Sequence, residues 1–172
     1  LLAEAGYPNG FEVTLDCPNN RYINDEKICV AAAGMLAKIG VTVKVNAMPR
    51  ANYFPKAQKL DTSFYMLGWG GATTDAMFTL QPVLHSRNDK GDGDYNWGNY
   101  KDAEFDRLID SAKTDVDLKR RLETINKAMK YHADNVLHIP LHLQLIPWVS
   151  RANVEVIHRA DNWLEVPWVK MK

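Results

Sequence analysis

Two stretches of the chain alternate apolar and polar residues, and a stretch with helical spacing lies between them. Residues 11–17 (FEVTLDC) and 41–47 (VTVKVNA) place every second side chain on one apolar face, which is typical of a strand with one buried face. From Asn24, a predicted N-cap, to Gly40, apolar residues recur at the spacing of a helix. A strand, a helix and a strand in this order predict a right-handed βαβ unit with parallel strands.

A glycine-rich stretch follows at residues 63–77 (SFYMLGWGGATTDAM). The apolar run at 64–67 predicts a buried strand, and the glycines after it predict a turn. Thr74 or Asp75 could then cap a helix. Because ligands of open α/β sheets lie outside the carboxyl ends of strands, Trp69 in this turn is a candidate wall of a binding cleft. The alternative is a tight strand–helix turn whose tryptophan packs inward.

The remainder of the chain contains more helical than strand-like patterns. Helical periodicity predicts helices at residues 51–59, 75–84, 102–112 and 118–129, with Asp102 as the cap of the third. The stretch 136–145 is strand-like although Pro140 interrupts it. At the start, residues 1–6 resemble the last turn of a helix with a glycine cap, so we expect the chain to be a piece of a longer protein.

Length and charge exclude several classes of protein. The 172 residues suit one compact domain, and 21 basic residues balance 21 acidic ones. A net charge of zero argues against nucleic acid and against a polybasic membrane contact. No signal peptide and no membrane-spanning window are visible in the sequence. Five tryptophans favour recognition of a ligand or partner.

The two cysteines allow two interpretations. Cys17 ends the apolar face of the first predicted strand, and Cys29 lies in the second turn of the helix after it. In a βαβ unit these positions are close enough for a disulfide, which requires an oxidising compartment. The alternative is a pair of small buried hydrophobic residues.

Residues that could bind a metal or catalyse a reaction fit no known constellation well. Asp92, Asp94 and Asn96 match the first ligands of a calcium loop, but Trp97 and Ala103 stand where glycine and glutamate are required. A solvated acidic loop is the simpler interpretation.

The histidines and the remaining motifs also give no evidence for a metal site or for an enzyme. His138 and His142 would be about 13 Å apart on a strand, too far to share a metal. No nucleophile elbow or phosphate-binding motif occurs. The sequence therefore predicts no metal, no cofactor and no enzymatic activity.

Several short motifs occur along the chain in a recognisable order. They are LLAEAGYPNG at 1–10, FEVTL at 11–15, MLAKIGVTV at 35–43, LGWG at 67–70 ahead of Asp75, YKDAEFDRLID at 100–110 and HIPLH at 138–142. This ordered set resembles the C-terminal lobe of the family 5 extracellular solute-binding proteins, the dipeptide and oligopeptide receptors of ABC importers. The resemblance covers nearly the whole chain.

The resemblance implies an α/β fold, a type II periplasmic-binding-protein lobe with a mixed, mainly parallel sheet flanked by helices. Residues 1–172 would form a single lobe, with 150–172 returning toward an N-terminal lobe that is missing here. The function implied is capture of a peptide or other small solute between two lobes, for the membrane subunits of an ABC importer. The location implied is periplasmic or extracellular, and the oxidising periplasm favours the disulfide between Cys17 and Cys29.

The same resemblance places the glycine-rich turn at the cleft. The residues expected to contact ligand are Gly68, Trp69, Gly70, Gly71, Ala72, Thr73, Thr74 and Asp75, together with Tyr95, Asn96 and Trp97. Ala72 stands where peptide receptors of the family place an aspartate that holds the ligand's amino group, so another solute or another amine contact is expected. The alternatives to solute capture are a protein-interaction module and an enzyme in the same cleft.

Overall fold

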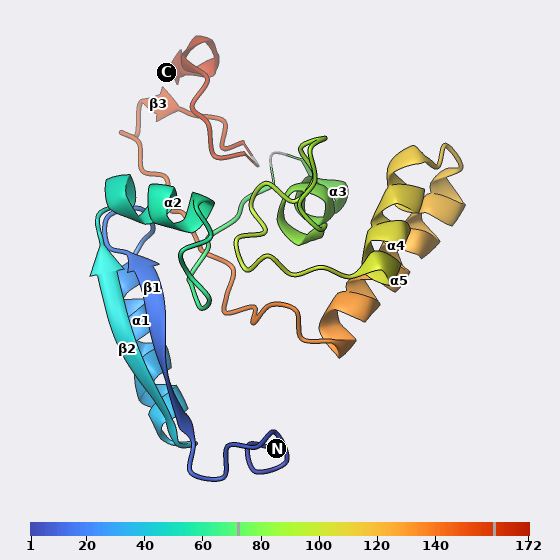
Figure 1. Cartoon of the computed structure of the whole chain (residues 1–172). Coiled ribbons are helices and arrows are strands. Elements are labelled where there is room, and N and C mark those ends of the chain that lie inside the picture. Colours follow the sequence, from blue (N-terminus) through green and yellow to red (C-terminus); the bar gives the residue numbers. More distant parts are fainter. Residues whose placement is uncertain (72, 160) are drawn as a thin grey trace. The chain divides into compact units, whose positions relative to one another are not determined.

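The computed structural model describes residues 1–71, 73–159 and 161–172, and these residues form two compact units. Unit 1 contains residues 1–68 and 86–101, and unit 2 contains the described residues of 69–85 and 102–172. The chain passes from unit 1 to unit 2 between Gly68 and Trp69, within the glycine-rich turn. Figure 1 shows the helices and strands of both units.

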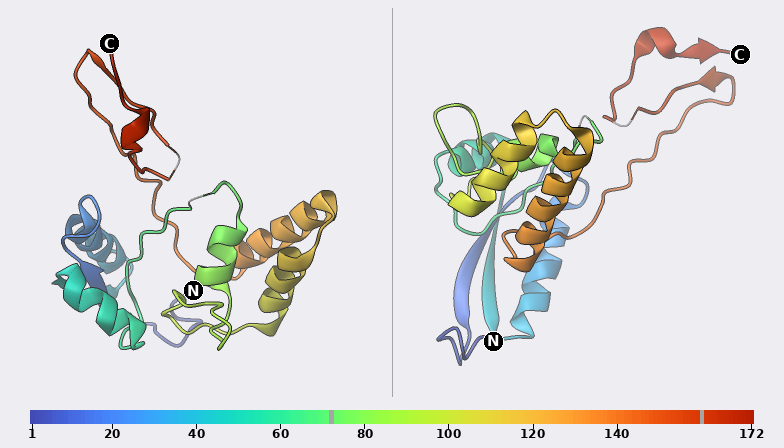
Figure 2. Two further views of the ribbon diagram at one scale, coloured as in Figure 1. Left: turned by 90° about the horizontal axis from the view of Figure 1, so that it is seen from above. Right: turned by 90° about the vertical axis from the view of Figure 1, so that its right-hand side faces the viewer.

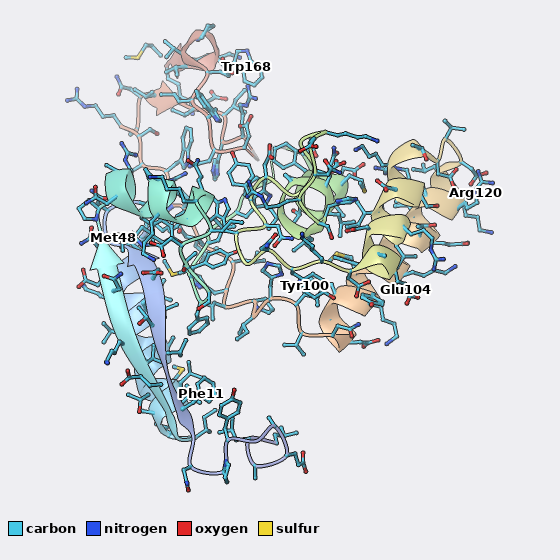
Figure 3. All side chains as sticks on the ribbon, in the orientation of Figure 1. Phe11, Met48, Tyr100, Glu104, Arg120 and Trp168 are labelled. Atoms are coloured by element: carbon cyan, nitrogen blue, oxygen red, sulfur yellow. A yellow bond between two sulfur atoms is a disulfide. The ribbon has the colours of Figure 1, made fainter. Side chains whose placement is uncertain are left out.

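Unit 1 contains the predicted βαβ unit. Strand β1 (Phe11–Pro18) is followed by helix α1 (Asp25–Ala37) and strand β2 (Val41–Met48). The two strands pair in parallel over their whole length, from Phe11 with Val41 to Pro18 with Met48. Figure 3 labels Phe11 and Met48 at opposite ends of this pair, and α1 lies along the strands in Figures 1 and 2. The prediction of parallel strands around a helix is therefore confirmed.

The face of β1 that carries Leu15 and Cys17 forms the first core of unit 1. Leu15, Cys17 and Cys29 are buried there, and Val43 and Val45 of β2 pack against them. The two cysteines form a disulfide between β1 and α1. The structure thus decides between the two interpretations of the cysteines in favour of the bridge.

The first residues end a helical turn as predicted. The N–H of Gly6 donates to the carbonyl of Ala3 (3.1 Å), and the N–H of Tyr7 donates to the carbonyl of Leu2 (2.8 Å). With Gly6 at a φ of 89°, this is the Schellman arrangement of hydrogen bonds, which needs a left-handed residue at that position.

The prediction of Asn24 as a capping side chain is wrong. Asn24 adopts a left-handed conformation and makes no side-chain hydrogen bond to the helix. The carboxylate of Asp25 instead accepts hydrogen bonds from the N–H groups of Arg21, Tyr22 and Glu26 at 2.9–3.0 Å. Burial raises the pKa of Asp25, but these backbone donors outweigh it, so the pKa lies below its ordinary value.

The predicted strand at 64–67 is reduced to a single bridge between Tyr65 and Asp16. Two hydrogen bonds form it, from Asp16 N–H to the Phe64 carbonyl and from Met66 N–H to the Asp16 carbonyl. Beyond this point the backbone is held by side chains, because the Met66 carbonyl accepts from the hydroxyl of Tyr53 (2.6 Å). The next ladder donor on β1 would be residue 18, and Pro18 has no N–H, so the bridge does not extend into a ladder.

Helix α2 (Arg50–Gln58) contributes the second core of unit 1. Tyr53, Ala57 and Trp97 are buried in it, and Phe54 and Tyr65 pack against them. Pro55 is the sixth residue of this helix, so it supplies no N–H to the carbonyl of Ala51, four residues earlier.

Unit 2 begins with a short helix that differs from the predicted one. In place of one α-helix over 75–84, α3 covers Met77–Thr79 and a π-helical turn, η1, covers Leu80–Leu84. Pro82 has no N–H and cannot donate to the carbonyl of Phe78, as an α-helix would require. The turn widens instead, and His85 N–H donates to the carbonyl of Leu80, five residues back (2.9 Å).

Helices α4 (Ala103–Thr114) and α5 (Leu118–Asp134) form an antiparallel pair. Asp102 caps α4 as predicted, because its carboxylate accepts from the N–H groups of Glu104 and Phe105. Phe105 is buried and stacks on Tyr131 of α5, with ring centroids 5.5 Å apart. Figure 3 labels Glu104 and Arg120 at opposite ends of the pair, as the antiparallel arrangement requires.

The end of unit 2 is mostly irregular. Strands β3 (Val154–Glu155) and β4 (Lys170–Met171) pair antiparallel, with the 3-10 turn η2 (Val166–Trp168) between them in sequence. The prediction of strand-like structure at 136–145 is wrong, because Pro140 lacks a ladder donor and no residue of this stretch is in a strand. No helix among the described residues has the length and hydrophobicity needed to cross a membrane.

Candidate ligand-binding site

Gly68 is the last residue of the first segment of unit 1, and Tyr22 of the same unit holds its backbone in place. The Tyr22 hydroxyl donates to the Gly68 carbonyl (3.1 Å), and burial raises the pKa of this hydroxyl, so it remains a donor at neutral pH. A Cβ at position 68 would lie 2.6 Å from Cε1 of the Tyr22 ring. Only glycine therefore lets the backbone approach the ring this closely. The glycine predicted to allow close approach does so toward a tyrosine of the protein itself.

Trp69 opens unit 2, and its indole is half-buried. The indole N–H donates to the carbonyl of Phe78 (3.1 Å), and the two rings have centroids 6.1 Å apart. Since Pro82 supplies no N–H to that carbonyl, the tryptophan donates where an α-helix would have used its own backbone. The indole is thus held in one orientation with part of its surface accessible, which suits a wall for a flat or apolar ligand.

The residues after Trp69 expose their backbone. Gly70 and Gly71 are exposed, as are Thr73, Thr74 and Asp75. A Cβ at Gly71 would lie 2.9 Å from the carbonyl oxygen of Thr73, whereas one at Gly70 would meet no atom within 4 Å. Exposed N–H and C=O groups in such a turn can bind polar groups of a ligand. Ala72 lies outside the described residues.

Asp75 is engaged by other groups of unit 2. Its carboxylate accepts from the N–H of Met77 (2.9 Å) and pairs with the guanidinium of Arg121 on α5 (2.8 Å). The hydrogen bond from Arg121, followed by the one from Met77, holds the pKa of Asp75 below its ordinary value. The carboxylate therefore stays ionised and acts as a brace that joins the turn to α5.

Residues 95–97, the second group predicted to contact ligand, lie in unit 1. One of these residues is exposed and the other two are buried. Tyr95 is 40% exposed, whereas Asn96 and Trp97 are each 1% exposed. The Asn96 side chain bonds the backbone of Tyr100 in both directions, at 2.8 and 3.2 Å. Of the three, only Tyr95 presents a broad surface, and a role of all three in ligand contact stays a prediction.

A polar hollow of about 410 Å³ beside β1 has its charges paired within the protein. Asp16 is buried in it and accepts from the amide of Asn46 (2.7 Å) and from the ammonium of Lys56 (3.0 Å). Lys56 also lies 3.5 Å from the carboxylate of Asp61. Lys56, the one cation among the described residues that line the hollow, is thus shared by two carboxylates of the protein, and these contacts hold the start of the segment that leads to Gly68.

The residues that position the turn could not be predicted from the sequence. Tyr22, Phe78 and Arg121 each bond a predicted site residue, but they come from a loop, a short helix and a distant helix. No local pattern marks them, because each acts through a contact formed only in the fold. Pro82 was the one available signal, since a proline in a helical pattern frees a carbonyl four residues earlier.

The arrangement of elements defines a class of protein. The chain resembles the structure of "ABC transporter-associated periplasmic binding protein DppA from Helicobacter pylori in complex with peptide STSA", with a TM-score of 0.75 over 99% of this chain and 33% of that one. At 24% sequence identity this likeness establishes the fold, which is that of the type II periplasmic binding proteins. The predicted α/β fold class is therefore confirmed.

Sequence comparison then gives the family. Residues 1–91 match the bacterial extracellular solute-binding proteins, family 5 Middle, and the chain belongs to this family. It is 36% identical over 115 residues to heme-binding protein A of Haemophilus influenzae, which is 65% of this chain and 20% of that protein. It is 28% identical over 136 residues to glutathione-binding protein GsiB of Pectobacterium atrosepticum, which is 76% of this chain and 24% of that protein. The chain thus spans about a fifth to a quarter of these relatives.

Proposed function

We propose that this chain is part of the substrate-binding component of an ABC importer, which captures a peptide or another small solute outside the cytoplasmic membrane. Its membership of a solute-binding family carries the proposal. Relatives named for heme and for glutathione, and a similar structure that holds a peptide, show that the fold accommodates small solutes of different chemistry. The protein would act by binding and release, without catalysis.

The solute would lie in a cleft between this lobe and a second lobe of the same protein. Closure of two lobes about a hinge is a known way to trap a ligand. Within this chain, Trp69 would supply an apolar wall, and the exposed backbone of Gly70, Gly71 and Thr73 would supply polar contacts. Residues 150–172 would return toward the second lobe, and the importer's membrane subunits would receive the closed receptor.

The acidic group that could hold a ligand amine differs from that of the peptide receptors. Position 72 carries alanine, and the nearby carboxylate of Asp75 is already bound by Arg121 and Met77. Removing Asp75 from Arg121 to bind an ammonium group would leave the arginine without that partner, at a cost comparable to a charged hydrogen bond. We therefore expect selectivity to depend on the aromatic wall and the backbone more than on Asp75.

Isothermal titration of the intact protein tests the proposal. A panel of short peptides, glutathione and heme should contain at least one solute that binds, and Trp69→Ala should weaken its binding at least tenfold, because a buried aromatic anchor commonly contributes about 2 kcal/mol. Trp163→Ala is the matched control, since Trp163 is 71% exposed and lies in another segment of the chain. Equal affinity of Trp69→Ala and the unaltered protein would remove Trp69 from the site.

A further inference from the structure

A hollow of about 320 Å³ lies on unit 1, away from the charges paired around Asp16. It is lined by one cation, one anion, one amide and two aromatic rings: Arg87, Asp94, Gln58, Tyr95 and Trp97. Small-molecule sites in proteins begin at about 300 Å³ and combine apolar walls with a few polar groups. The size and lining of this hollow therefore suit a small organic molecule.

The aromatic side of the hollow is the exposed ring of Tyr95, supported by the buried Trp97. Trp97 is buried, and its indole packs against the rings of Phe54 and Tyr65, with centroids 5.9 Å away in both cases. Tyr95 continues this packing to the surface, with its ring 5.7 Å from that of Trp97. Side chains locked in this way bind a flat ligand with little loss of rotamer freedom.

Arg87 lines the same hollow, and only part of the hydrogen-bonding capacity of its guanidinium is used. It is half-buried, and its Nη1 donates to the backbone carbonyl of Asp94 (3.0 Å). Among the described residues, no carboxylate lies within ion-pair distance of Arg87, in contrast to Arg121 with Asp75 at 2.8 Å. A guanidinium has five N–H donors in a fixed fork, and a carboxylate is the group that matches two of them at once.

The loop that carries Arg87 is held in place by its own hydrogen bonds. The Asn88 side chain accepts from the N–H groups of Lys90 and Asp92 and donates to the Asp92 carboxylate at 2.9 Å. The carbonyl of Asp94 also accepts from the indole N–H of Trp97 (3.1 Å). The loop and the Asp94 carbonyl therefore hold the guanidinium of Arg87 in one orientation, and its remaining N–H donors are preorganised for a ligand.

We propose that this hollow binds a small monocarboxylate whose body is flat or apolar. The carboxylate takes the fork of Arg87 in a bidentate pair, and the body lies against the exposed ring of Tyr95, which packs on the buried Trp97. Asp94, which is exposed at the edge of the hollow, disfavours a second negative charge on the ligand. The site lies entirely within unit 1 and requires no contact from Trp69, so it goes beyond solute capture at the turn.

Titrations of the intact protein with phenylacetate, phenylacetamide and phenyl phosphate, followed by NMR, test this inference. The unaltered protein should bind phenylacetate at least tenfold more tightly than either of the other two, with shifts at the side-chain N–H groups of Arg87 and Trp97. Arg87→Gln should weaken phenylacetate binding at least tenfold and change phenylacetamide binding by less than twofold. The matched control is Arg151→Gln, an exposed arginine of unit 2, which should bind as the unaltered protein does.

Arg87→Lys keeps the charge and separates binding from folding. It should restore part of the phenylacetate affinity lost in Arg87→Gln, because an ammonium attracts a carboxylate without offering the fork. Circular dichroism should show that all three variants fold. The inference is overturned if the unaltered protein does not bind phenylacetate, if it binds the amide equally well, or if Arg87→Gln and Arg151→Gln bind alike. None of these results bears on the Trp69→Ala titration, which tests solute capture separately.

Discussion

Replacing Gly68 with alanine should destabilise the protein, whereas the same replacement at Gly70 should not. A Cβ at position 68 would lie 2.6 Å from Cε1 and 2.8 Å from Cδ1 of Tyr22, and a Cβ at position 70 would meet no atom within 4 Å. Carbon atoms in contact are normally about 3.5–4.0 Å apart, so the added methyl group overlaps the ring by about 1 Å. Both glycines are exposed members of one turn, which makes them a matched pair.

The cost at position 68 follows from what must move. If the ring shifts, the hydrogen bond of 3.1 Å from the Tyr22 hydroxyl to the Gly68 carbonyl is lost, which is about 1 kcal/mol. If the ring stays, the overlap is overpacking, which typically costs about 1–3 kcal/mol. We therefore expect Gly68→Ala to lower the free energy of unfolding by about 1–3 kcal/mol and Gly70→Ala to change it by no more than about 0.5 kcal/mol.

Urea unfolding followed by circular dichroism and tryptophan fluorescence measures both variants. A third variant, Tyr22→Ala, removes the ring, and in that background Gly68→Ala should cost no more than about 0.5 kcal/mol. Two results would refute the reasoning. One is an equal cost of alanine at 68 and at 70, and the other is a cost at 68 that persists without the Tyr22 ring.

Three further predictions concern the bridge, the loop before α1 and the indole. Reducing the disulfide should lower the free energy of unfolding by about 3 kcal/mol, from the entropy of a loop closed by cysteines 12 residues apart, and a loss below about 1 kcal/mol in thiol-containing buffer would contradict this. The pKa of Asp25 is held below 3.8 in the folded protein, so this carboxylate stabilises the fold above pH 3.8, and the stabilisation is lost as the pH falls through the folded pKa. Asp25→Asn should therefore flatten the acid side of the curve of stability against pH, and an unchanged curve would contradict this prediction. Pro82→Ala supplies an N–H that competes with the Trp69 indole for the Phe78 carbonyl, so NMR should show faster hydrogen exchange at the indole N–H. Unchanged or slower exchange would show that the proline does not control the orientation of the indole.

The βαβ unit of this protein could be predicted from sequence because its signals are local. Alternation at 11–17 and 41–47 and helical spacing between them are properties of neighbouring residues, and the structure gives the strands in full parallel register. The run at 64–67 has an equally apolar sequence but makes only one bridge. Its Phe64 carbonyl accepts from Asp16 of β1, but its Met66 carbonyl accepts from the hydroxyl of Tyr53, and a hydroxyl from a distant helix leaves no periodic trace in the sequence.

The candidate site was predictable in position more than in detail. The glycines and Trp69 are where the sequence placed a turn, and the close approach at Gly68 is real. The sequence could not show that Asn96 and Trp97 are buried, because a tryptophan in a polar loop is equally compatible with a surface and with a core. It also contained no indication of Arg87, since the hollow beside this arginine exists only after Trp97 has packed against three rings from two other segments.

Pro82 shows how a local defect in a helix can determine the geometry of the proposed binding surface. Within unit 2 it prevents an α-helical hydrogen bond to the Phe78 carbonyl, and that carbonyl accepts the indole N–H of Trp69. The orientation of the aromatic wall therefore depends on a residue 13 positions away that would not itself touch a ligand there. In a receptor of this kind the helix after the turn has two tasks, to cover the core with Leu80, Val83 and Leu84 and to hold the tryptophan. An uninterrupted α-helix would serve the first task and leave the indole without this acceptor, so the π-helical turn belongs to the proposed binding site as much as to the core.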